Sequence, residues 1–168
     1  MASLDSIMKP RSIAVVGAST KPNTIGSDLL KRLIEYGFTG KIYPVNPKGG
    51  VIEGLTAYPS VLDIPGDVDL AIIVVKNTFV LSTIDQCHEK GITGLVVISA
   101  GFKETDEAGA ALEKELAAKV KAYGMRCVGP NCLGVVNTDP AVRMDGCFAE
   151  SLPQRGDIGF VSQSGALG

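Results

Sequence analysis

Short apolar runs rich in valine and isoleucine alternate with amphipathic segments along most of the chain, and this alternation limits the possible folds most strongly. Five runs are apolar at nearly every position, which is typical of parallel strands covered on both faces. They span residues 12–17, 41–46, 69–75, 94–99 and 126–129. Because crossovers between parallel strands are right-handed, this order predicts an α/β fold built on a doubly wound parallel sheet.

Three helices are predicted between these runs, each from one apolar stripe at helical spacing. The stripes are Ile25, Leu29, Leu30, Leu33 and Ile34; then Phe79, Val80, Ile84 and Cys87; then Ala108, Leu112, Leu116 and Val120. Gly37 and Gly91 are expected to end the first two helices, since glycine adopts the left-handed conformation that follows many helices. Asn77 and Thr105 are the expected N-caps of the second and third helices.

The composition excludes several classes of protein. The chain has 168 residues, with 16 lysines and arginines against 18 aspartates and glutamates, so its net charge is −2. This balance argues against binding of nucleic acid through bulk electrostatics. The longest apolar runs, such as residues 70–75, are too short to cross a membrane, and residues 1–12 lack the apolar core of a secretory signal. We therefore expect no nucleic-acid or membrane partner.

The cysteines are spread along the chain without a pairing or metal-binding pattern. They are Cys87, Cys127, Cys132 and Cys147; no C-x-x-C motif occurs, and His88 is the only histidine. Zinc sites need closely spaced cysteines and histidines, so no metal site is predicted. Reduced thiols indicate a cytoplasmic location.

The pattern changes after Asn137. Residues 138–157 contain turn dipeptides and no clear periodicity, whereas residues 158–162 (IGFVS) again predict a strand. The chain then stops where a strand–turn–helix unit begins. We therefore expect one domain over residues 1–137, and a linker with the truncated start of a second domain over residues 138–168.

Ligands of a doubly wound sheet bind beyond the carboxyl ends of the strands, so the loops there carry the functional information. The first loop, residues 17–26 (GASTKPNTIG), combines small and hydroxyl residues that let a phosphate approach the backbone and the next helix. It matches neither G-x-G-x-x-G nor a P-loop, and a plain strand–helix turn has a similar composition. The loop alone thus favours phosphate binding without identifying the ligand.

The second loop begins Asn46-Pro47-Lys48. NAD-binding domains usually place a carboxylate here for the ribose hydroxyls, whereas this loop offers an amide and a cation. A ribose that bears a phosphate fits better, as in coenzyme A or NADP, although Lys48 is equally compatible with a solvated turn.

The later loops give weaker signals. Residues 76–78 and 99–102 are small or polar and suit tight turns as well as ligand contact. The fifth loop, residues 129–134 (GPNCLG), contains a thiol, but His88 is predicted on a distant helix and no other base is evident. Cys132 is therefore not expected to be a covalent nucleophile. Asn131 is expected to fix the backbone or to contact a ligand.

Together, the loops SIAVVGAST, VNPKGG, VISAGF, VGPNCLGVVN and GDIGFVSQSGALG resemble the Rossmann-like CoA-binding domain of NDP-forming acyl-CoA synthetases. That superfamily includes ADP-forming acetyl-CoA synthetase and, more distantly, the α subunit of succinyl-CoA synthetase. The resemblance runs from about Ile7 to Gly168. The sequence departs from the family at Lys76, where many relatives have proline.

The resemblance implies roles for individual residues. Those that would bind coenzyme A are Gly17, Ala18, Ser19, Thr20, Lys21, Asn46, Pro47, Lys48, Val75, Lys76, Ile98, Ser99, Ala100, Asn131 and Cys132. Those that would receive the phosphate of a phosphohistidine are Ser162, Ser164, Gly165 and Ala166. The histidine, the second ligase-CoA domain and the ATP-grasp domain or subunit that uses ATP and magnesium would all lie outside this chain. The chain alone would then bind CoA or acyl-CoA without turnover, within a larger and oligomeric enzyme.

Other functions remain open at this stage. The same region occurs fused to a protein acetyltransferase, where it is regulatory, and a CoA-binding module without catalysis is also conceivable. An NAD(P)-dependent oxidoreductase is disfavoured by the missing G-x-G-x-x-G motif and the missing acidic residue.

Overall fold

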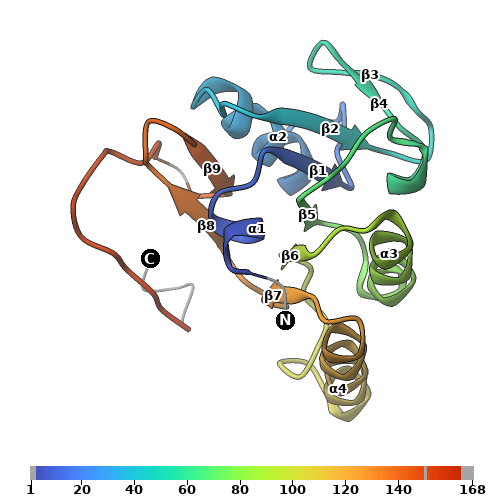
Figure 1. Cartoon of the computed structure of the whole chain (residues 1–168). Helices are drawn as coiled ribbons and strands as arrows, with labels where there is room; N and C mark the ends of the chain where they lie inside the picture. The colour runs from blue at the N-terminus through green and yellow to red at the C-terminus, as the bar shows by residue number, and fades with distance from the viewer. Residues whose placement is uncertain (1–2, 150, 164–168) are drawn as a thin grey trace.

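A parallel five-stranded sheet forms the centre of the computed structural model, which describes residues 3–149 and 151–163 (Figure 1). The strands are β1 Ser12–Val16, β2 Lys41–Val45, β5 Leu70–Ile73, β6 Gly94–Val97 and β7 Arg126–Val128. They lie in the order β2-β1-β5-β6-β7, and every neighbouring pair is parallel. All five predicted strands are confirmed, each one or two residues shorter at its carboxyl end.

Helices cover both faces of the sheet, as the apolar runs predict. The helices are α1 Asp5–Met8, α2 Ile25–Glu35, the 3-10 turn η1 Val61–Asp63, α3 Asn77–Lys90 and α4 Glu107–Ala122. Alternate residues of β1 point to opposite faces: Ala14 and Val16 pack in the core under α3 and α4, whereas Ile13 and Val15 pack in the core under α1 and α2. The sheet is therefore doubly wound. No helix in the described residues is long and apolar enough to cross a membrane.

Two of the predicted helix caps are wrong by one residue. Asp106, not Thr105, is the N-cap of α4, because its carboxylate accepts a hydrogen bond from the Gly109 amide at 2.8 Å. The N-cap of α3 is Lys76, and the Asn77 side chain instead donates to the carbonyl of Gly101. The Asn77 amide thus ties the start of α3 to the loop after β6.

The predicted apolar stripes are buried at the middle of each helix and exposed at some helix ends. Ile25, Ile34 and Phe79 are each at least 39% exposed, while Leu29, Leu33 and Ile84 are fully buried. Ala108 is also exposed, because α4 packs chiefly through Leu116. The ends of a helix project beyond the sheet that covers its middle, so apolar side chains there remain in contact with solvent.

Two antiparallel hairpins complete the fold. The first joins β3 Gly50–Ile52 to β4 Leu55–Ala57, and the second joins β8 Gly134–Asn137 to β9 Met144–Cys147. β9 is fully buried although it lies within residues 138–157, where no periodicity was expected. The second hairpin packs on the face of the sheet that carries α2.

The strand predicted for residues 158–162 is not present. Ile158, Phe160 and Val161 are 71–97% exposed, and no described strand pairs with them. An apolar run becomes a strand only when a neighbouring strand satisfies its backbone, and none of the strands within residues 3–149 and 151–163 pairs with this run.

Candidate functional site

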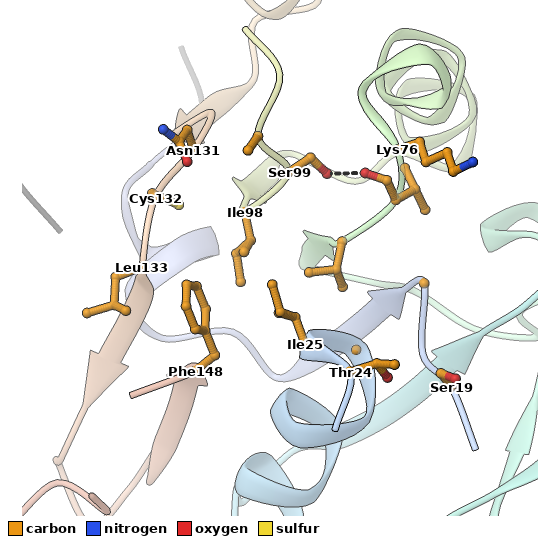
Figure 2. A pocket seen from close by; sticks show the side chains of 15 residues that line it. Ser19, Thr24, Ile25, Lys76, Ile98, Ser99, Asn131, Cys132, Leu133 and Phe148 are labelled. Atoms are coloured by element: carbon orange, nitrogen blue, oxygen red, sulfur yellow. Dashed lines mark hydrogen bonds between the residues drawn. The ribbon is translucent and has the colours of Figure 1, made fainter. Parts of the chain in front are cut away.

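A cavity of about 810 Å³ opens at the carboxyl ends of the parallel strands (Figure 2). Its walls come from the loops after β1, β5, β6 and β7, from the first residues of α2 and from Phe148, which follows β9. This is the edge of the sheet at which ligands of a doubly wound fold bind. A volume of this size suits a small organic molecule or cofactor.

Nine of the predicted ligand-binding residues line the cavity together. They are Gly17, Ser19, Val75, Lys76, Ile98, Ser99, Ala100, Asn131 and Cys132. Ala18, Thr20, Lys21, Asn46, Pro47 and Lys48 are not part of its lining. Of the predicted phosphate-binding residues, Ser162 is exposed and outside the lining, and Ser164, Gly165 and Ala166 lie outside the described residues.

The loop after β1 brings backbone close to the start of α2. Gly17 has φ +100°, and a Cβ there would lie 2.6 Å from the carbonyl oxygen of Val74. A Cβ at Gly26 would lie 2.0 Å from the carbonyl oxygen of Gly17. Thr24 caps α2 by accepting a hydrogen bond from the Ser27 amide. The glycines thereby let the positive end of α2 face the cavity, which suits an anionic group.

Asn46 holds two loops in place rather than facing the cavity. Its amide donates to the carbonyl of Ala18 at 2.8 Å, and its side-chain oxygen accepts from the Lys48 amide at 2.9 Å. Asn46 therefore braces the first loop against the second. Lys48 is exposed beside them and is not part of the cavity lining.

The loops after β5, β6 and β7 are also braced against one another. Ser99 donates to the carbonyl of Val75 at 2.6 Å, and the amide of Asn131 donates to the carbonyl of Ser99 at 3.0 Å. Gly129 permits close approach as well, since a Cβ there would lie 2.3 Å from the carbonyl oxygen of Val97. This bracing gives the cavity a largely preformed wall.

Cys132 lacks the surroundings of an activated nucleophile. Its thiol donates to the carbonyl of Val97 at 3.3 Å, and burial raises the pKa of Cys132 to about 11. The thiolate is the reactive form of cysteine, and it is scarce at neutral pH when the pKa is so high. His88 is remote from the lining: it lies on α3, where its ring stacks on Tyr123 with centroids 3.9 Å apart.

The lining of the cavity combines one cation, hydroxyl groups and apolar side chains. Lys76 is the only lysine or arginine among the described lining residues, and no carboxylate accompanies it. Ser19 and Thr24 add hydroxyl groups, whereas Ile25, Leu133 and Phe148 present apolar surface. Such a site favours a ligand with an anionic part and a less polar part.

Sequence reasoning missed part of the lining: Thr24, Ile25, Gly26, Val74, Leu133 and Phe148. Five of these six adjoin predicted residues or belong to a loop already singled out, so a wider reading of each loop would include them. Phe148 carried no signal, because it reaches the cavity only through the packing of β9.

Comparisons with known proteins agree with this geometry. The family model for the CoA binding domain matches residues 11–138. Over 98% of its length the chain is 48% identical to the acetate–CoA ligase (ADP-forming) II subunit alpha of Pyrococcus furiosus, of which it covers 35%. It is 45% identical over 96% of its length to the 4-hydroxybutyrate–CoA ligase (ADP-forming) of Nitrosopumilus maritimus, of which it covers 23%.

A solved structure of a related enzyme also matches the chain over nearly its whole length. The dinucleotide-forming acetyl-coenzyme A synthetase 1 of Ca. Korarchaeum cryptofilum, in complex with phosphate and ADP, matches with a TM-score of 0.92 and 44% identity. The match covers 99% of this chain and 35% of that one. The chain thus spans about a third or less of the length of these relatives. On its fold, its loops and the family match over residues 11–138, the chain belongs to the CoA binding domain family.

Proposed function

We propose that the chain binds coenzyme A in the cavity at the carboxyl ends of the strands, as the CoA-binding part of an ADP-forming acyl-CoA ligase. The observation that carries the proposal is a preformed cavity whose described lining holds one cation and no carboxylate, in a member of the CoA binding domain family. Identity of 48% to an ADP-forming acetate–CoA ligase subunit supports the ligase rather than a regulatory or oxidoreductase role.

The polarity of the cavity suggests how coenzyme A lies in it. The pyrophosphate is placed at residues 17–21, beside Lys76 and the first turn of α2, where backbone amides and the helix dipole favour an anion. Lys48 is assigned to the 3′-phosphate of the nucleotide, which projects toward the second loop. The pantetheine arm then runs past Ile98, Ser99 and Ala100 toward Asn131 and Cys132.

In this proposal the thiol of coenzyme A, not a thiol of the protein, attacks the activated acyl group. The high pKa of Cys132 supports that division of roles. Acyl activation would use a phosphohistidine outside this chain, together with an ATP-grasp domain or subunit, ATP and magnesium. We propose an oligomeric enzyme in the cytoplasm, a location supported by four unpaired cysteines.

The proposed organisation is a CoA-binding unit over residues 1–137, followed by a linker and the start of a second ligase-CoA domain over residues 138–168. β9, which follows that boundary, pairs with β8, which precedes it. Ser162, Ser164, Gly165 and Ala166 are proposed to receive the phosphate of the phosphohistidine.

Calorimetric titration of the chain with CoA and with NADH in parallel tests the proposal. We expect saturable binding of CoA and at least tenfold weaker binding of NADH. Desulfo-CoA should bind nearly as well as CoA, since the nucleotide half supplies most of the affinity through charge-assisted contacts. Equal affinity for NADH, or no binding of CoA, would contradict the proposed function.

A further inference from the structure

The apolar side chains of Leu133 and Phe148 in the cavity wall have no assigned role. Figure 2 shows Leu133 and Phe148 together on one side of the cavity, with Lys76 and Ser19 on the other. Cys132 lies next to Leu133, and the Phe148 ring extends from the end of β9 toward the middle of the cavity. An anionic ligand would not need this surface, and Phe148 remains 39% exposed.

A buried ion pair anchors β9, the strand that Phe148 follows, to α2. Arg32 of α2 lies 2.7 Å from Asp145 of β9, and Asp145 is fully buried. The thiol of Cys147 also contacts Asp145, at 3.1 Å. Because Phe148 directly follows β9, the anchoring of the strand to α2 limits where the backbone of Phe148 can lie at the cavity wall.

We propose that Leu133 and Phe148 form the surface against which the acyl group of a CoA thioester packs. The proposal rests on the proposed function, which brings the thiol end of CoA to Asn131 and Cys132. An acyl group attached to that sulfur is uncharged, and the lining beside Asn131 and Cys132 includes the apolar side chains of Leu133 and Phe148. The chain itself then favours longer aliphatic acyl groups over the free thiol.

The expected gain in affinity per methylene of the acyl group follows from how far the surface formed by Leu133 and Phe148 is open to solvent. A fully buried methylene strengthens binding by about fourfold. An acyl group resting against an open wall buries roughly one side, so each added methylene should strengthen binding by about twofold. From acetyl-CoA to hexanoyl-CoA, four methylenes longer, the dissociation constant should therefore fall by about 16-fold.

Calorimetry with CoA, acetyl-CoA, butyryl-CoA and hexanoyl-CoA tests this dependence on the 168-residue chain. In Phe148→Ala we expect the gain from acetyl-CoA to hexanoyl-CoA to shrink to about threefold or less, and this gain is a ratio that does not depend on the variant's affinity for CoA itself. Phe160→Ala is the matched control, because Phe160 is 71% exposed and is not part of the described lining. It should leave the whole series unchanged.

Different results distinguish an error in the proposed function from an error in the inference about the acyl group. If no ligand binds to the wild-type chain, the proposed function is wrong and this inference falls with it. If CoA binds but acyl length has no effect, or if Phe148→Ala keeps the full gain, only the inference is overturned. Should Phe148→Ala fail to fold, Leu133→Ala decides in the same titrations: a reduced gain supports the inference and an unchanged gain overturns it.

Discussion

Replacement of Arg32 by methionine should destabilise the protein strongly, because it leaves a buried carboxylate without its cation. The guanidinium Nη2 of Arg32 lies 2.7 Å from Asp145 Oδ2, and the two side chains are 10% and 0% exposed. Loss of one partner from a buried ion pair costs about 3–5 kcal/mol. The total free energy of unfolding of a domain is only about 5–15 kcal/mol, so Arg32→Met should remove a large share of it.

Urea unfolding at pH 7, followed by circular dichroism, measures this loss against a matched control. Arg11 forms an ion pair with Asp69 at 3.2 Å, but the Arg11 side chain is 85% exposed. Solvent screens such an exposed pair, so Arg11→Met should lower the free energy of unfolding far less than Arg32→Met does. The double variant Arg32→Met/Asp145→Leu should recover part of the loss, since it removes both charges.

If Arg32→Met lowered the free energy of unfolding no more than Arg11→Met, the buried ion pair would not stabilise the protein as expected. That expectation would also be refuted if the double variant were less stable than Arg32→Met alone, because the unpaired carboxylate would then not be the cause. The comparison requires similar denaturant slopes in all variants, since a changed slope indicates a change in the unfolded or native ensemble.

Three further predictions follow from the site. Lys48→Ala should weaken CoA binding about tenfold or more in calorimetry, because a charge-assisted contact contributes about 1.5–3 kcal/mol, and should weaken dephospho-CoA less; equal losses would mean that Lys48 does not contact the 3′-phosphate. Cys132→Ser should retain CoA binding. Alkylation of Cys132 by iodoacetamide, followed by mass spectrometry, should accelerate as the pH rises toward the thiol's pKa of about 11, and fast labelling at pH 7 would contradict so high a pKa. Gly26→Ala should lower both the melting temperature and the CoA affinity, because its Cβ would lie 2.0 Å from the carbonyl oxygen of Gly17, whereas Gly156→Ala has nothing within 4 Å and should be neutral in both measurements.

The central sheet could be predicted from the sequence because each strand carries its own signal. Residues 12–16 and 70–73 are apolar at almost every position, and both faces of these strands are indeed buried. The helix ends were less predictable, since neighbouring polar residues such as Thr105 and Asp106 compete for one capping position. Only the three-dimensional course of the loop decides which side chain reaches the amide.

The second hairpin could not be predicted, because its stability depends on a distant residue. β9 reads Met-Asp-Gly-Cys, and a buried aspartate is acceptable in it only because Arg32 lies opposite on α2. Residues 158–162 show the reverse case, since a sequence suited to a strand finds no described partner. The same distinction governs the cavity: the loop residues follow from the positions of the strands, whereas Phe148 depends on long-range packing.

The helices that follow the neighbouring strands β1 and β5 leave toward opposite faces of the sheet, and this arrangement affects how the domain can change during evolution. α2 leaves β1 toward one face of the sheet and α3 leaves β5 toward the other, although the two strands are neighbours. The opening between their loops is therefore produced by chain connectivity, and among its lining residues the close approaches at Gly17 and Gly26 restrict substitution most strongly. Residues such as Lys76 and Leu133 can be exchanged with little cost to the two cores. Directed evolution confined to these loops should accordingly yield many folded variants with altered ligand preference, while random changes in β1 or β5 should mostly yield unfolded ones.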